Sequence, residues 1–475
     1  MKRLLNPKLK SKKINILSFY ITFIMFSLIP AKLNLSQTVK ELFPVRFESH
    51  SSEINIKVNT AGYQYILGEN YPFCPNEIFI DGEPVDIVGG NCRMIYIPES
   101  ALDNYITLYW IDSLTSLQSI FDWRTNIIEI DLSSFDSSYV VDMTDMFYGC
   151  SSLTSINFSN LNTALVEDMQ RMFYDCDSLT ELDLSSFITS KVTTMANMFK
   201  GCSNLKILNI ESFDTSNVVN MQKMFNLLES IEYLDLSNFN TSKVITMESM
   251  FSNCRNLTSL NLLSFNTSIV TDMSNMFSDD ISLEFINLSN FNTSNVISMN
   301  LMFKGCVSLT SLVLSSFDTV KVIDMSYMFY NCRKILYLNL SNFKTPNLKV
   351  MYSMFFGCKS LISLNITNFD TSLVTDMYDL FALNEKLIEL DLSFFNTSNV
   401  VEMSAMFYEC NSITFLNLSN FDASKSKSLE MFFYNCYSLS NIDLTNFNTN
   451  NIEMMSFMFY HCNSLTSLDL LSFNT

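Results

Sequence analysis

The sequence predicts an α/β solenoid of about 13–14 strand–turn–helix coils with one long parallel sheet, preceded by a small β-rich N-terminal cap. Three observations lead to this fold: an unbroken 26-residue repeat, two halves of the repeat with different hydrophobic periodicity, and turn-forming residues concentrated ahead of the repeat. With 475 residues, 48% of them hydrophobic and 16% charged, the chain can bury a large core, which excludes a disordered protein.

Residues 1–31 have the pattern of a secretory signal peptide. Six Lys and Arg residues precede residue 32, and residues 14–31 form a mostly apolar stretch that ends in Ala31. An uncleaved signal-anchor and a buried core helix are the alternatives. Because both membrane-related interpretations place the rest of the chain outside the cytosol, we expect a secreted or cell-surface protein. It would contact a membrane only through this segment, if the segment is uncleaved.

Residues 32–105 are predicted to form the β-rich cap. Five of the eight Pro and five of the nine Gly residues lie between residues 32 and 100. Alternating apolar residues at 54–58 and 77–80 predict short strands. Cys74 and Cys92 lie outside the repeat, and in an oxidising compartment the simplest expectation is a disulfide between them; two unrelated thiols are the alternative.

Residues 106–475 carry the repeat, which is marked by a Met-Phe dipeptide that returns every 26 residues. The dipeptide begins at 146, 172, 198, 224, 250, 276, 302, 328, 354, 406 and 458, with Leu-Phe at 380 and Phe-Phe at 432. Such constant spacing indicates identical coils stacked side by side. The last copy lacks its second half, so we expect that the solenoid is incomplete at the C-terminus.

Each repeat has a strand-like half and a helix-like half. The first follows the pattern L-x-x-L-x-L-x-x-F, as from Leu153 onward, which predicts a short strand with alternate residues in the core. The second, such as residues 140–150, places apolar residues at steps of three and four, which predicts a helix with capping Ser or Thr, such as Thr215, ahead of it. A Phe column after the strands, which includes Phe291, is predicted to form a buried spine.

The unit LSSFDTVKVIDMSYMFYNC resembles the 26-residue repeat of the BspA-like leucine-rich-repeat surface proteins. The resemblance covers about residues 106–475, and it rests on the period, the Met-Phe pair, the Cys and the L-x-x-L-x-L run together. It implies a leucine-rich-repeat solenoid that is displayed outside the cell and used for adhesion or partner binding. The resemblance implies nothing about residues 32–105.

Ten of the twelve Cys residues share one register of the repeat. A metal site would need C-x-x-C pairs or His partners. A disulfide ladder would leave a Cys unpaired in each uninterrupted run, and the distance between neighbouring coils exceeds the Cβ separation of a disulfide. We therefore expect buried, unpaired thiols. Asp280 and Asn384 at this register suggest that it tolerates partial exposure.

Composition and motifs argue against catalysis and against nucleic-acid binding. The two His residues, at positions 50 and 461, are too far apart in sequence to suggest a catalytic site, and no G-x-G-x-x-G or phosphate loop is present. The formal net charge of −19 would repel a phosphate backbone. We expect no enzyme activity, no cofactor, no metal and no nucleic-acid partner.

The exposed face of the predicted sheet is the candidate binding surface. One outward register carries Tyr233, Phe285 and Tyr337 in alternate coils, about 10 Å apart, and Phe415 further along. Exposed aromatic rows suit contact with a protein or glycan on another cell or matrix. Mutual packing of these rings on a broad sheet, and a structural spacer or coat protein without a specific ligand, are the alternatives. An adjacent Asn and Asp register would supply hydrogen bonds to the partner.

Overall fold

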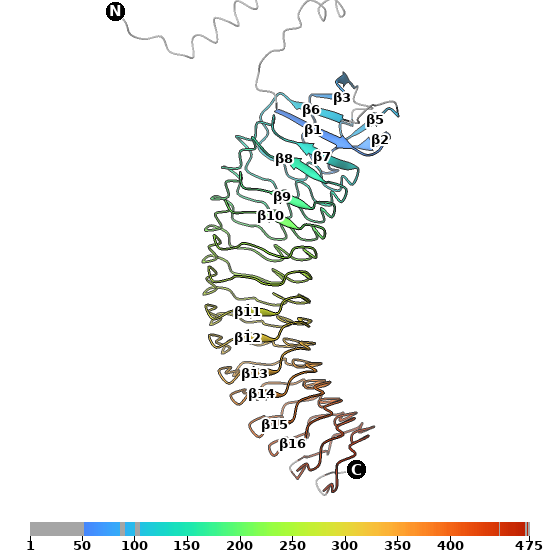
Figure 1. Cartoon of the computed structure of the whole chain (residues 1–475), viewed down its shortest axis with the longest axis vertical. Coiled ribbons are helices and arrows are strands. Elements are labelled where there is room, and N and C mark those ends of the chain that lie inside the picture. The colour runs from blue at the N-terminus through green and yellow to red at the C-terminus, as the bar shows by residue number, and fades with distance from the viewer. Residues whose placement is uncertain (1–51, 86–90, 100–104, 446, 471–472, 474–475) are drawn as a thin grey trace, which may run out of the picture. The chain divides into compact units, whose positions relative to one another are not determined.

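A computed structural model describes residues 52–85, 91–99, 105–445, 447–470 and 473. They belong to one unit, residues 50–475, in which the coils follow one another in chain order (Figure 1). The predicted signal segment, residues 1–31, and the first part of the cap region lie outside the described residues.

Two small sheets precede the coils. Their strands are β1 (Ser52–Val58), β2 (Gly62–Tyr65), β3 (Glu77–Ile80), β4 (Glu83–Pro84), β5 (Met94–Ile97) and β6 (Tyr105–Trp110). In β1 alternate side chains are buried, as the alternation of apolar and polar residues predicts. The strands β2 and β5 form an antiparallel pair, and Cys74 and Cys92 are joined by a disulfide with a Cα–Cα distance of 5.6 Å.

The sheet that begins in the cap continues into the solenoid. Its order is β4-β3-β6-β1-β7-β8, where β7 (Ile127–Asp131) pairs antiparallel with β1 and parallel with β8 (Ser155–Asn157). The predicted boundary at residue 105 falls at the start of β6, which pairs with both β1 and β3. Cap and coils therefore share one hydrogen-bonded face.

Beyond β8 the strands are three residues long and pair two by two. The parallel pairs are β9 (Glu181–Asp183) with β10 (Ile207–Asn209), β11 (Phe285–Asn287) with β12 (Ser311–Val313), β13 (Tyr337–Asn339) with β14 (Ser363–Asn365), and β15 (Glu389–Asp391) with β16 (Phe415–Asn417). The prediction of one long parallel sheet is thus wrong for the described residues.

The hydrogen bonds that lead into the strands differ between paired and unpaired coils. The N–H of Thr310 donates to the Glu284 carbonyl at 2.9 Å, just ahead of the paired strands β11 and β12. At the equivalent place in two unpaired coils, the N–H of Thr258 lies 3.5 Å from the Glu232 carbonyl. A hydrogen bond this long is weak, so the ladder between strands does not continue there.

The predicted helices are also wrong, because the described residues contain no helix and the second half of each coil is a series of turns. Each coil has two residues with left-handed backbone four positions apart, as at Asp145 (φ 57°) and Gly149 (φ 69°), whereas an α-helix needs φ near −63° throughout. The N–H of Met143 donates to the Asp168 carbonyl of the next coil at 3.0 Å, not within its own segment. Successive turns thus reproduce the spacing of three and four residues without a helix.

The turn side of the coils holds the stack together continuously. Eleven consecutive parallel bridges link equivalent residues from Ser116 to Glu402, and a further bridge joins Ser428 to Met454. The eleven bridges therefore join twelve successive coils, and the further bridge joins two more. The structure is a β-solenoid, with turns in place of the predicted helices.

The core columns are confirmed as buried. Met143, Met146 and Phe147 are 0% exposed, and so are their equivalents from Met169 to Phe303. The Phe column after the strands is buried as well, with Phe291 1% exposed. The expectation for the Cys register is also confirmed: its ten thiols are free, nine of them buried, and the thiol of Cys150 donates to the Phe121 carbonyl at 3.0 Å. Burial raises the pKa of Cys150 to about 12.

A column of buried Thr hydroxyls joins each coil to the next, and we did not predict it. The Thr215 hydroxyl donates to the Asn240 carbonyl at 3.0 Å and accepts the N–H of Asn240 at 2.8 Å. The same pattern recurs at Thr293 with Asp318, at 2.8 Å in both directions. Thr at this register is therefore not a helix cap but a bridge between coils.

Replacing Thr293 by Val should lower the free energy of unfolding by about 2 kcal/mol, because the change removes both hydrogen bonds between the buried Thr293 hydroxyl and the backbone of Asp318. Urea unfolding followed by circular dichroism measures the effect. Thr310→Val is the matched control, since its exposed hydroxyl makes one hydrogen bond, to the Glu284 carbonyl. Equal shifts for the two variants would contradict the assignment.

Candidate functional site: the strand face

We define the strand face as the outward side chains at two registers of the strand half. The first register runs from Glu129 through Ser155 and Glu181 to Phe415, and the second, two residues later, runs from Asp131 to Asp443. The residue between them, such as Leu182 or Ile286, points into the core. This alternation fixes which side chains reach solvent.

The four predicted aromatic residues lie on the first register and are all exposed. Their exposed fractions are 62% for Tyr233, 48% for Phe285, 68% for Tyr337 and 54% for Phe415. Among the described residues, none of these four rings lies in contact with another aromatic ring. This disfavours the alternative that the rings pack against one another on the sheet.

Each exposed ring in a strand pair stands beside a small or polar residue. Phe285 is opposite Ser311, and Tyr337 is opposite Ser363. Phe415 is opposite Glu389. Because the neighbour is short in two of these pairs, one face of the ring stays accessible. The structure therefore presents separate aromatic side chains and does not bring them together into one cluster.

The second register uses part of its hydrogen-bonding capacity within the fold. The side-chain oxygen of Asp183 accepts the N–H of Ser185 at 3.0 Å, and that of Asn287 accepts the N–H of Ser289 at 3.0 Å. These bonds form Asx-turns that end the strands. The backbone N–H of Ser185 holds the pKa of Asp183 below its usual value. One oxygen of each side chain is thus committed to the turn, in contrast to the predicted role of contacting a partner.

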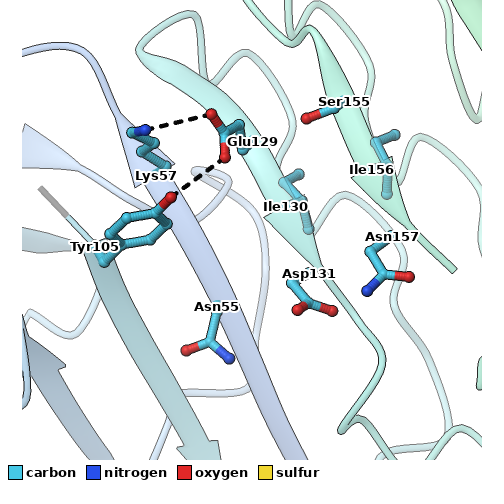
Figure 2. A pocket seen from close by; sticks show the side chains of 9 residues that line it. All are labelled: Asn55, Lys57, Tyr105, Glu129, Ile130, Asp131, Ser155, Ile156 and Asn157. Atoms are coloured by element: carbon cyan, nitrogen blue, oxygen red, sulfur yellow. Dashed lines mark hydrogen bonds and ion pairs between the residues drawn. The ribbon is translucent and has the colours of Figure 1, made fainter. Parts of the chain in front are cut away.

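A hollow of about 490 Å³ lies at the head of the strand face, where the cap meets the first coils. Figure 2 shows its lining, which comes from β1, β6, β7 and β8: Asn55, Lys57, Tyr105, Glu129, Ile130, Asp131, Ser155, Ile156 and Asn157. The Glu129 carboxylate accepts from Lys57 Nζ at 3.4 Å and from the Tyr105 hydroxyl at 3.5 Å (Figure 2). Lys57 Nζ also lies 5.0 Å from the centre of the Tyr105 ring.

These contacts place polar and charged groups at the head of the face. Tyr105, and after it Glu129, raise the pKa of the Lys57 ammonium. A second hollow of about 300 Å³ follows directly, because it shares Ile156 and Asn157 with the first and extends to Glu181 and Asp183. The strand face is therefore hollowed at its head and carries exposed rings further along.

Lys57, Tyr105 and Glu129 were missed by the sequence reasoning. Lys57 and Glu129 are 72 residues apart, and the antiparallel register of β1 with β6 and β7 brings all three together. The alternation of apolar and polar residues at 105–110 predicts a strand at β6. It does not predict which strands pair with β6.

The strand face presents aromatic and polar groups. Among the described residues, no group of three or more His, Cys, Asp or Glu side chains could hold a metal ion. Over the same residues, we find no helix with the length and apolar character that crossing a membrane requires. Aromatic rings, amides, hydroxyls and carboxylates remain, and these groups suit contact with a partner surface.

Several solved structures resemble the chain at low identity. A leucine-rich repeat protein from Bacteroides ovatus has 18% identity and a TM-score of 0.33, covering 62% of this chain and 80% of that chain. A leucine rich cell surface protein from Faecalibacterium prausnitzii has 14% identity and a TM-score of 0.36, covering 86% and 93%. The functional domain of InlJ from Listeria monocytogenes, described as including a cysteine ladder, has 14% identity and a TM-score of 0.17, covering 78% and 68%.

No curated protein sequence matches the chain. One family model matches it in four overlapping segments, residues 92–204, 176–262, 255–364 and 356–473. Together these segments include well over half of the chain. The chain therefore belongs to the family described as Mycoplasma protein of unknown function, DUF285.

Proposed function

We propose that this chain is a non-catalytic repeat protein, secreted or displayed on the cell surface, whose strand face binds a protein or glycan on another cell or matrix. The observation that carries the proposal is the row of exposed rings, with Tyr233 62% and Tyr337 68% exposed on a regular scaffold. Large apolar side chains that stand in water gain free energy when a partner covers them. Aromatic residues are also the side chains that most often dominate binding energy.

A location outside the cytosol is supported by two features. Cys74 and Cys92 form a disulfide in the cap, and disulfides persist in oxidising compartments. The N-terminal pattern of basic and apolar residues predicts export of the chain. The BspA-like resemblance remains a prediction that points in the same direction.

Substituting the three rings by Ser tests the proposal. The variant Tyr233→Ser, Phe285→Ser, Tyr337→Ser should lose at least about tenfold in retention on cultured cells or immobilised glycans, because truncating a central aromatic anchor commonly costs more than 1 kcal/mol. The fold should survive, since these side chains contribute little to the core. Circular dichroism and the urea midpoint check folding.

The matched control removes three exposed apolar side chains from elsewhere on the coils. Tyr139→Ser, Ile245→Ser, Ile297→Ser replaces residues that are 56%, 50% and 45% exposed. Retention should not change in this control. Unchanged retention of the strand-face variant would instead favour a structural spacer or coat component without a specific ligand.

A further inference from the structure

The strand face carries acidic side chains and no basic ones across the coils. From residue 129 to residue 443, the two registers contain no Lys or Arg. Their acidic members are Glu129, Asp131, Glu181, Asp183, Asp235, Glu389, Asp391 and Asp443. Lys57 of the cap adjoins this face, and it is already paired with Glu129. The face is therefore acidic toward both ends of the stack, and from residue 259 to residue 365 its two registers carry no charged residue.

The ion pairs of the solenoid lie away from the strand face. Among the described residues, the ion pairs other than Lys57–Glu129 lie off the two registers, as Arg171–Asp145 and Lys304–Asp279 do at 2.6 and 2.8 Å. Of the eight acidic residues on the strand face, only Glu129 takes part in an ion pair within the described chain. The remaining charge of this face is thus not neutralised by the fold itself.

These charges are not required by the turns that they help to form. Asp183 and Asp235 accept the N–H two residues later at 3.0 Å, and Asn287 makes the same bond at the same distance. Asn forms the same Asx-turn in many coils. An Asp at this position therefore adds a negative charge but no further hydrogen bond within the fold. The N–H donors also lower the pKa of Asp183 and Asp235, which keeps both ionised in mildly acidic surroundings.

The acidic groups flank an aromatic centre. Tyr233, Phe285 and Tyr337 lie between Asp183 on one side and Glu389 on the other. Lys and Arg match this combination, because their charged ends pair with carboxylates while their stems and cations contact aromatic rings. A neutral glycan could donate hydrogen bonds to these carboxylates but would form no ion pair with them, and an anionic glycan would be repelled.

We infer that the strand face binds a basic segment of a partner protein, rich in Lys or Arg. The inference rests on the proposed function, since it names the class of partner for the same face. Charge complementarity selects this occupant over a glycan, and the exposed rings supply the apolar contacts.

The test uses a fluorescent lysine homopolymer and a neutral glucan oligosaccharide as probes with the full chain. The variant Asp183→Asn, Asp235→Asn, Asp391→Asn keeps the Asx-turns and removes three charges from the strand face. It should weaken binding of the lysine homopolymer about tenfold and reduce its dependence on salt, at a few tenths of a kcal/mol or more for each charge. The neutral oligosaccharide should bind neither protein measurably.

The control variant Asp214→Asn, Asp370→Asn, Asp422→Asn removes the same charge from Asx-turns off the strand face, where the bonds are 2.8–3.0 Å long. It should change the affinity for the homopolymer less than about twofold. Equal weakening of the two variants would mean attraction by net charge alone and would overturn the inference, as would no weakening of either. Unchanged cell retention with the strand-face Asp→Asn variant, combined with loss in the aromatic variant, would also overturn it while the proposed function stands.

Discussion

Phe291→Ala should lower the free energy of unfolding by about 4 kcal/mol, because it removes a fully buried ring and leaves a cavity that the stacked coils cannot close. Phe291 is 1% exposed and lies four residues after the end of β11, at the register whose rings line the core in coil after coil. The measurement is the urea midpoint and slope by circular dichroism.

Phe285→Ala supplies the control within the same coil. Phe285 lies six residues earlier but is 48% exposed, so its loss should cost less than about 1 kcal/mol. The two variants thus each remove a Phe ring from one coil, at an exposed position in β11 and at a buried position after it. An unchanged urea midpoint for Phe291→Ala would refute the assignment of this column to the core.

Asp280→Cys should raise the free energy of unfolding by about 3 kcal/mol at neutral pH, because it replaces a buried carboxyl group by the thiol that other coils carry. Asp280 is 0% exposed. Its Oδ1 accepts the N–H of Cys254 at 2.8 Å, and its Oδ2 has no hydrogen-bond partner among the described residues. Burial raises the pKa of this carboxyl well above its usual value.

The pH dependence of this effect has a defined sign. Since the folded state has the higher pKa, protonated Asp280 is tolerated below the ordinary carboxyl pKa of about 4, and stability is lost as the pH rises through the folded value. The gain from Asp280→Cys should therefore be large near pH 8 and shrink toward pH 4. Asn384→Cys, which also replaces a buried polar side chain at this register, should show no such pH dependence. A gain of equal size at both pH values would contradict the role of ionisation.

The repeat period was enough to predict which residues form buried columns. It was not enough to predict the backbone conformation between them. Equivalent residues fall in buried columns because the period is constant, so the spine that contains Phe291 is recoverable from spacing alone. The helix was wrongly predicted because turns and helices both place apolar residues at intervals of three and four. Gly149 and Gly201, both at a left-handed position, were the available signal against a helix.

Two details of the site could not be derived from the pattern. The hollow at the head depends on the antiparallel pairing of β1 with β6 and β7, which a repeat period does not specify. Asp280 and Asn384 were expected to be partly exposed, yet both are 0% exposed. A polar residue at this register does not indicate exposure, because the neighbouring coils enclose the register whichever residue occupies it.

The Thr hydroxyls and the bridges between coils run along the axis of the stack, which determines how the protein responds to force. A pull along this axis is carried in series by the bonds between every pair of coils. Because an end coil has only one neighbour, we expect coils to detach one after another from an end. Each released coil of 26 residues would add about 90 Å of extended chain. A protein tethered at one end could thus lengthen stepwise under tension while its remaining coils stay folded.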